Sequence, residues 1–155
     1  MPQNSILIVD DEISIRKSLK SILVDEGFKV HAVSSGEGCL NLLKKTTYNI
    51  LLLDIWLPGI DGLEVLEKIS KLESHPTVIM ITGHGNIESA VRATKLGAYD
   101  FLEKPLSIEK TLLTIQHALA QQELEKQNKN LKEKIENQYT IIGDSVPMKA
   151  LRQQL

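Results

Sequence analysis

The chain has 155 residues, which is enough for one ordinary domain and a short extension. Hydrophobic residues make up 42% and charged residues 25%, so a sizeable core is possible, while the net charge of −2 excludes the basic surface of a nucleic-acid-binding module. Its single cysteine, Cys39, excludes an internal disulfide framework and is expected in the core, and the absence of a signal pattern or a run of about 18 apolar residues favours a cytoplasmic protein without membrane contact.

Short apolar runs alternate with amphipathic stretches as far as Leu119. Five runs are predicted to be strands: 6–9, 29–33, 50–53, 78–81 and 99–102. The first, third and fourth are apolar throughout, which is typical of strands that helices cover on both faces of a parallel sheet. The second and fifth are more mixed, which indicates the two edge positions.

Five amphipathic helices are predicted between and after these strands. Their apolar stripes are Ile15, Leu19, Ile22 and Leu23; Cys39, Leu42 and Leu43; Leu63, Leu66 and Ile69; Ala90, Val91 and Thr94; and Leu112, Ile115 and Leu119. Gly27 and Gly97 are suitable ends for the first and fourth helices, Asn86 is a plausible N-cap for the fourth, and the fifth follows Ser107. The alternation predicts an α/β doubly wound sheet with right-handed crossovers.

The composition changes after Leu119, where Gln, Glu, Lys, Asn and Leu dominate without Gly or Pro. The fifth helix is expected to continue through residues 120–138. Leu124, Leu131 and Ile135 fit a sparse heptad seam with Asn128 inside it, which favours a coiled-coil homodimer. A plain solvated helix remains the alternative.

The predicted strand ends carry the polar residues of interest. Asp10 and Asp11 follow the first strand, Asp54 ends the third, Thr82 ends the fourth, and Lys104 follows the fifth. Since ligands of open α/β sheets bind beyond the carboxyl ends of the strands, we expect these side chains to converge at one edge.

Three carboxylates at one edge require a compensating charge. Two carboxylates about 4 Å apart repel by about 4 kcal/mol at an effective dielectric constant near 20. An all-oxygen ligand set suits a hard cation, and Mg²⁺ is the usual choice for a few carboxylates plus waters. Lys104 and Thr82 suit the oxygens of a phosphoryl group, and Asp54 is positioned as the nucleophile that forms an acyl phosphate.

These residues resemble the signature of bacterial two-component response-regulator receivers. The resemblance covers residues 5 to about 119 and is carried by Val9-Asp10-Asp11-Glu12, Leu53-Asp54-Ile55-Trp56-Leu57-Pro58-Gly59-Ile60-Asp61-Gly62, Thr82-Gly83-His84-Gly85 and Lys104-Pro105. It implies a flavodoxin-like five-stranded parallel sheet of order 2-1-3-4-5 with a C-terminal helical extension. It also implies phosphorylation of Asp54 by a sensor histidine kinase, in a signalling switch rather than a turnover enzyme.

The family resemblance assigns roles to individual residues. Asp11 and Asp54 would ligate Mg²⁺ directly with the main-chain carbonyl of Trp56, and Asp10 would act largely through water. Thr82 and Phe101 would form the switch pair. The Lys104-Pro105 bond would be cis.

A finer resemblance points to the NtrC and NtrX group of sigma-54-dependent nitrogen-regulation activators. It rests on residues 81–87, 97–105 and the helical tail, and residues 141–148 resemble the entry to their AAA+ ATPase module. The expected organisation is a receiver at 1–119, a helical linker at 120–138 and the start of a second domain at 139–155. No G-x-x-x-x-G-K-[ST] phosphate loop occurs in the 155 residues, so the output ATPase and DNA-binding domains are expected to be absent from this chain.

Three rival functions fit less well. A haloacid-dehalogenase-like phosphatase needs a second Asp two residues after its nucleophile, and Trp56 stands there. A receiver used only for dimerisation usually lacks one of the acidic or lysine positions, all of which are present. A flavodoxin-like flavin carrier needs a Ser/Thr/Gly-rich phosphate loop after the first strand, which the chain lacks.

Overall fold

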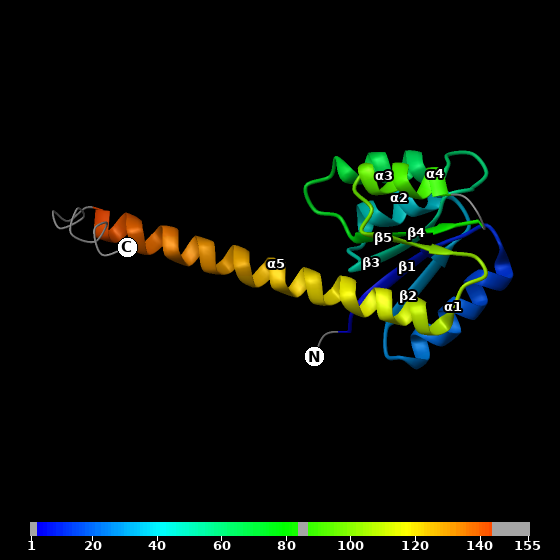
Figure 1. Cartoon of the computed structure of the whole chain (residues 1–155), viewed down its shortest axis with the longest axis horizontal. Helices are drawn as coiled ribbons and strands as arrows, with labels where there is room; N and C mark the ends of the chain where they lie inside the picture. Colours follow the sequence, from blue (N-terminus) through cyan, green and yellow to red (C-terminus); the bar gives the residue numbers. More distant parts are fainter. Residues whose placement is uncertain (1–2, 84–86, 144–155) are drawn as a thin grey trace. The chain divides into compact units, whose positions relative to one another are not determined.

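The computed structural model describes residues 3–83 and 87–143, with side chains up to residue 128. Its strands are β1 (Ser5–Val9), β2 (Lys29–Val33), β3 (Ile50–Asp54), β4 (Thr77–Thr82) and β5 (Asp100–Glu103). Its helices are α1 (Ile13–Asp25), α2 (Gly36–Lys45), α3 (Gly62–Ser70), α4 (Ile87–Lys95) and α5 (Ile108–Gly143). The elements alternate along the chain as the hydrophobic pattern predicts (Figure 1).

The five strands form one parallel sheet of order β2-β1-β3-β4-β5. This confirms the predicted flavodoxin-like topology and the edge positions of β2 and β5. In the register of the sheet, Asp54 is paired with Ile81, and Thr82 with Glu103. The carboxyl ends of β1, β3 and β4 therefore meet in the middle of one edge, where β1 and β3 are direct neighbours.

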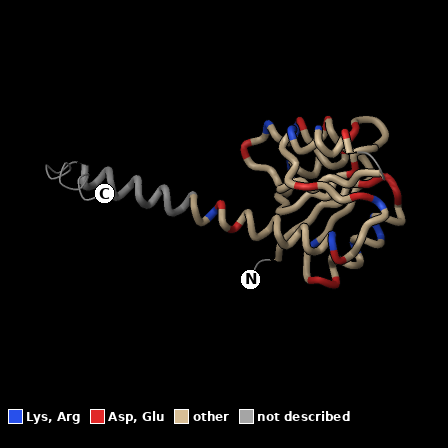
Figure 2. Tube along the Cα trace, in the orientation of Figure 1, with Lys and Arg blue, Asp and Glu red and all other residues tan. Residues whose placement is uncertain are grey.

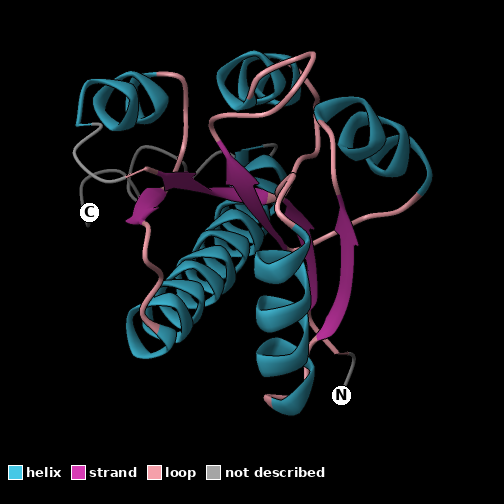
Figure 3. Ribbon diagram, turned by 90° about the vertical axis from the view of Figure 1, so that its right-hand side faces the viewer, coloured by secondary structure: helices cyan, strands magenta, loops and turns pink. Residues whose placement is uncertain are grey.

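Helices cover both faces of the sheet (Figure 3), which explains why the central strands are apolar on both sides. The core on one face takes in buried residues of α2, α3 and α4, among them Cys39, Leu66 and Ala93. The core on the other face takes in residues of α1 and α5, such as Leu23 and Ile115. Burial raises the pKa of the Cys39 thiol to about 12, which fits its predicted role as a small core residue.

Local signals explain where several helices begin and end. Asp61 caps α3 by accepting a hydrogen bond from the Glu64 N–H. Gly27 and Gly97 follow α1 and α4 with φ angles of 95° and 110°, the left-handed conformation that glycine adopts without strain. Both helix ends are where the sequence predicts them.

The predicted stripe of α4 is partly wrong. Val91 was expected on the apolar face but is 49% exposed, whereas Ala90 and Ala93 are fully buried. Residues three apart lie on the same face of a helix, so Ala93 shares the buried face with Ala90 and Val91 does not. The small alanine side chains let this face approach the sheet closely. The proposed cap, Asn86, lies outside the described residues.

Helix α5 runs from Ile108 to Gly143, so it continues through residues 120–138 as predicted. The chain divides into two compact units, Met1–Leu119 and Ala120–Leu155. The helix includes residues 139–143, the first part of the segment assigned to a second domain, and residues 144–155 lie outside the described part. Leu124 is 56% exposed, while the side chains of Leu131 and Ile135 are not described.

Charged residues of both signs are interspersed along the described helices and loops (Figure 2). Within the described part of the chain, no helix combines the length and the apolar character needed to cross a membrane.

Candidate functional site

The ends of the strands bring three carboxylates together. Asp10 and Asp11 directly follow β1, and Asp54 is the last residue of β3. One carboxylate oxygen from each of the three residues lies within 4.8 Å of the others. Asp10 and Asp54 are almost completely buried, and Asp11 is exposed. The group therefore has two inner carboxylates and one that faces solvent, as a partly hydrated cation would need.

The ammonium group of Lys104 lies among these carboxylates. Its Nζ is 3.2 Å from Asp10 Oδ2 and 3.3 Å from Asp54 Oδ2. A third carboxylate, Glu12 Oε1, lies 3.2 Å away on the solvent side. Lys104 follows β5 and precedes Pro105 through a cis peptide bond, as the family resemblance implies. The structure thus brings carboxylates from the ends of β1 and β3 to one ammonium that follows β5.

The charges of the cluster do not balance evenly. Burial and, after it, the Asp10 carboxylate raise the pKa of Asp54 to about 6, despite the opposing effect of Lys104. Burial alone would lower the pKa of Lys104, but the attraction of Asp54 and Asp10 outweighs it and raises that pKa. A single ammonium thus serves three carboxylates. The site has an excess of negative charge that a further cation would relieve.

Thr82 lies at the end of β4, fully buried. Its hydroxyl oxygen Oγ1 has no hydrogen-bond partner among the described residues. A buried hydroxyl without a partner costs free energy, so this atom is suited to an oxygen of a bound group. Phe101, the other member of the predicted switch pair, lies on the adjacent strand β5, half-buried against the core that α2, α3 and α4 cover.

Backbone contacts orient the two inner carboxylates. Asp10 Oδ1 accepts a hydrogen bond from the Glu12 N–H (2.9 Å), and Asp54 Oδ1 accepts one from the Trp56 N–H (3.2 Å). The Arg16 guanidinium donates to the main-chain carbonyl of Asp10 at 2.7 Å. The Trp56 side chain itself is 62% exposed.

Sequence reasoning assigned no role to three residues that support the site. Glu12 contacts Lys104, Arg16 holds the Asp10 backbone, and Gly62 packs against the Asp54 carbonyl. The spacing of Arg16 six residues after Asp10, in the second turn of a helix that starts beside the site, is a weak signal for its contact. Nothing in the sequence pattern indicates the other two contacts, because they depend on close approach of distant segments.

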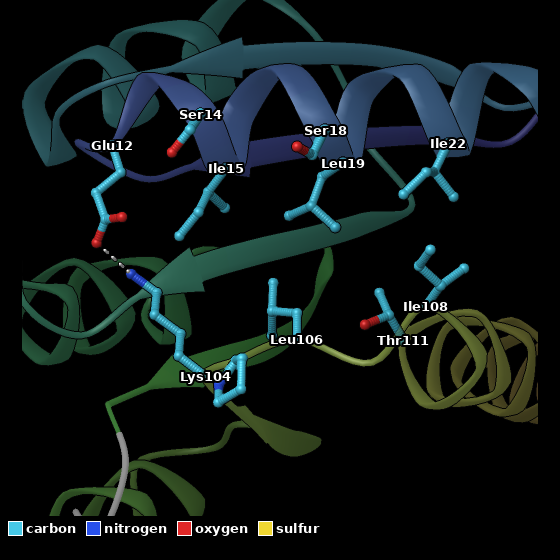
Figure 4. A pocket seen from close by; sticks show the side chains of 11 residues that line it. Glu12, Ser14, Ile15, Ser18, Leu19, Ile22, Lys104, Leu106, Ile108 and Thr111 are labelled. Atoms are coloured by element: carbon cyan, nitrogen blue, oxygen red, sulfur yellow. Dashed lines mark hydrogen bonds and ion pairs between the residues drawn. The ribbon is translucent and has the colours of Figure 1, made fainter.

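A groove of about 720 Å³ adjoins the site between α1 and the start of α5 (Figure 4). Ile15, Leu19 and Ile22 of α1 form one wall. Leu106 and Ile108 lie opposite, and the Glu12–Lys104 ion pair stands at one end. Anything bound in the groove would therefore lie directly beside Lys104.

Known proteins resemble this chain over most of its length. The family described as the response regulator receiver domain matches residues 6–116. A putative NtrX-like response regulator of Rickettsia conorii is 41% identical over 96% of this chain and 32% of its own length. The nitrogen assimilation regulatory protein NtrX of Azorhizobium caulinodans is 39% identical over 96% of this chain and 33% of its own length. The chain thus spans about a third of the length of the curated relatives it matches.

Solved structures show the same likeness. The receiver domain of NtrX from Brucella abortus is 42% identical, with a TM-score of 0.71 over 74% of this chain and 98% of that one. A longer NtrX structure from the same organism is 37% identical, with a TM-score of 0.81 over 99% of this chain and 34% of that one.

Proposed function

Because the chain belongs to the response regulator receiver family and its relatives are NtrX-like regulators, we propose that Asp54 accepts a phosphoryl group in a Mg²⁺-dependent reaction. The convergence of three carboxylates on the Lys104 ammonium at one sheet edge carries this proposal. The phosphoryl donor is a sensor histidine kinase, and the product is a switched state of the receiver.

The residues present fit a magnesium ion. Asp10, Asp11 and Asp54 would supply carboxylate oxygens to the ion. The Trp56 main-chain carbonyl would be a further ligand, and Asp10 would act largely through water. Burial and, after it, the neighbouring Asp10 carboxylate raise the pKa of Asp54, and a bound cation would offset both effects. When bound, the ion neutralises the carboxylates and the oxygens of the phosphoryl group.

The protein groups then have separate roles. An oxygen of Asp54 attacks the phosphorus atom, and the bond from phosphorus to the donor breaks, which leaves an acyl phosphate on Asp54. Lys104 pairs with a phosphoryl oxygen, and the Thr82 hydroxyl donates to another. The buried Thr82 oxygen, which has no partner among the described residues, supports this role. As Thr82 moves toward the phosphoryl group, Phe101 packs further inward and alters the surface of α4 and β5.

Acetyl phosphate tests the chemistry without a kinase. With Mg²⁺, the protein is expected to gain one phosphoryl group, and fragmentation should locate it on Asp54. Excess EDTA should prevent the reaction. Asp11→Ala should lose Mg²⁺ binding and phosphorylation together, because it removes a metal ligand. The variant should still fold, since the Asp11 side chain is exposed. Full phosphorylation in EDTA, or a phosphoryl group on another residue, would contradict the proposal.

The same proposal covers the organisation of the chain. Residues 1–119 form the receiver, residues 120–138 a linker helix, and residues 139–155 the start of an AAA+-like domain. The relatives, about three times as long, and an NtrX structure from Brucella abortus determined with ADP support an output region of this kind. We propose that the protein controls transcription through this output region, since its relatives include NtrX-like response regulators.

A homodimer is the proposed assembly, formed through the linker helix. Leu124 is 56% exposed on an otherwise polar stretch, and burying it against a second copy would stabilise the pair. The intact chain is expected to sediment as a dimer at tens of micromolar, a range in which weak helical pairs associate, whereas a version that ends at Leu119 should be a monomer. If the intact chain and the shortened version both sediment as monomers, with and without phosphorylation, the dimer proposal is wrong and the helix is a simple linker.

A further inference from the structure

Glu12 occupies the N-cap position of α1, but its side chain does not cap the helix. Its carboxylate instead accepts a hydrogen bond from Lys104 Nζ at 3.2 Å, from a residue 92 positions away in the sequence (Figure 4). The residues that normally cap a helix at this position are the shorter Ser, Thr, Asp and Asn. The longer Glu12 side chain reaches Lys104 instead of the first turn of its own helix.

Lys104 has inner and outer acceptors. The Asp10 and Asp54 side chains are 0% and 4% exposed, whereas that of Glu12 is 55% exposed. Lys104 lies between them, at hydrogen-bonding distance from all three. The ammonium can thus shift from the inner pair toward Glu12 without losing every anionic partner.

This shift matters because the inner carboxylates have two uses. Lys104 now contacts Asp10 and Asp54, and the proposed Mg²⁺ site needs oxygens of the same residues. Two cations held by the same carboxylates repel each other, so cation binding favours withdrawal of the ammonium from these contacts. Glu12 is the acceptor that lies on the outer side.

We propose that Glu12 is a positioning residue that holds Lys104 when a divalent cation binds at Asp10, Asp11 and Asp54. The inference rests on the proposed function, since it presupposes the cation site. Glu12 keeps the ammonium within the cluster but away from the inner oxygens, so that the cation and Lys104 occupy the site together. The lysine then remains available for a phosphoryl oxygen.

The groove beside the site supports the direction of this movement. Lys104 and Glu12 line one end of it, next to the first turns of α1 (Figure 4). The Lys104 side chain is 21% exposed, so its outer side is not enclosed by other groups. The ammonium contacts the exposed Glu12 on the side of the groove and the fully buried Asp10 on the inner side.

Mg²⁺ titration of the full chain tests this role. Trp56 is the single tryptophan, adjacent in sequence to the site and largely exposed, so its fluorescence can report binding, with calorimetry as a second measurement. Glu12→Gln keeps the shape of the side chain and removes its charge. The substitution is expected to weaken Mg²⁺ binding about fivefold. This factor corresponds to the upper end of the free energy that an exposed ion pair contributes.

A double-mutant cycle separates this role from a general charge effect. If Glu12 acted only through its negative charge, Glu12→Gln would weaken cation binding by about twofold, whichever residue occupied position 104. Lys104→Met should bind Mg²⁺ more tightly than the wild type, because no ammonium competes. In that background, Glu12→Gln should weaken binding much less than fivefold. Glu109→Gln, in the first turn of α5, is the matched loss of one exposed charge.

The outcomes distinguish the two proposals. The positioning role is supported if Glu12→Gln weakens Mg²⁺ binding more when Lys104 is present than when Met replaces it. Equal effects in both backgrounds, no effect at all, or an effect no larger than that of Glu109→Gln would overturn it. A wild-type protein that binds no Mg²⁺ by fluorescence or calorimetry would overturn the proposed function, and this inference with it.

Discussion

Asp54→Asn is expected to abolish phosphorylation while making the metal-free protein more stable at neutral pH. The amide cannot act as the nucleophile, so no acyl phosphate should form with acetyl phosphate and Mg²⁺. The same change removes a buried charge that shares one ammonium with Asp10 and Glu12. Activity and stability should therefore move in opposite directions.

The size of the stability gain follows from the pKa of Asp54. A rise from 3.8 to about 6 means that the folded protein disfavours the ionised carboxylate. Each pKa unit corresponds to about 1.4 kcal/mol, so the free energy of unfolding should rise by on the order of 1–3 kcal/mol. Relaxation of the groups around Lys104 makes values below the upper end possible.

The pH dependence has a definite sign. Because the pKa is higher in the folded than in the unfolded state, this carboxylate binds a proton on folding between pH 3.8 and about 6. The wild type gains stability from the group as pH falls through this window and loses it as pH rises. The advantage of Asp54→Asn should thus be full above pH 6 and shrink toward pH 4.

Urea unfolding in EDTA at two pH values measures the difference between the proteins. Added Mg²⁺ should stabilise the wild type and have little effect on the variant, because binding to the folded state shifts the unfolding equilibrium. A variant less stable than the wild type at neutral pH without metal would contradict the account of excess negative charge.

Gly62→Ala is expected to destabilise the fold and the site together. A Cβ atom at this position would lie 2.1 Å from the Asp54 carbonyl oxygen and 2.7 Å from the Ile55 Cα. Both are main-chain atoms, and the Gly62 N–H already bonds the Ile55 carbonyl at 2.8 Å, so the strand end cannot move away cheaply. The expected cost is about 3 kcal/mol or more, at the upper end for overpacking.

Phosphorylation should slow as well, since the displaced backbone belongs to Asp54 itself. Gly83→Ala is the control for stability, because its added Cβ meets no atom of the described residues within 4 Å, its chain neighbours apart. It should change the free energy of unfolding by less than about 1 kcal/mol. If Gly62→Ala unfolds at the same urea concentration as the wild type, the close packing at the end of β3 is not needed.

The sequence by itself determined the architecture and the main residues brought to the site. Apolar runs separated by amphipathic stretches predict a parallel sheet, and parallel strands end at a common edge. Asp10, Asp54 and Thr82 could therefore be placed together before any coordinates, since each ends or follows a strand. The edge positions of β2 and β5 followed from their mixed composition in the same way.

The tertiary structure alone decided which side chains support those residues. Glu12 turns from its own helix to Lys104, and Gly62 leaves room for the Asp54 carbonyl, through approaches of a few ångströms between distant segments. Val91 is exposed while Ala93 is buried, because the packing of α4 against the sheet decides which of its residues are covered. Periodicity records which residues share a face of one element, but the distance and orientation between elements arise from packing all of them at once.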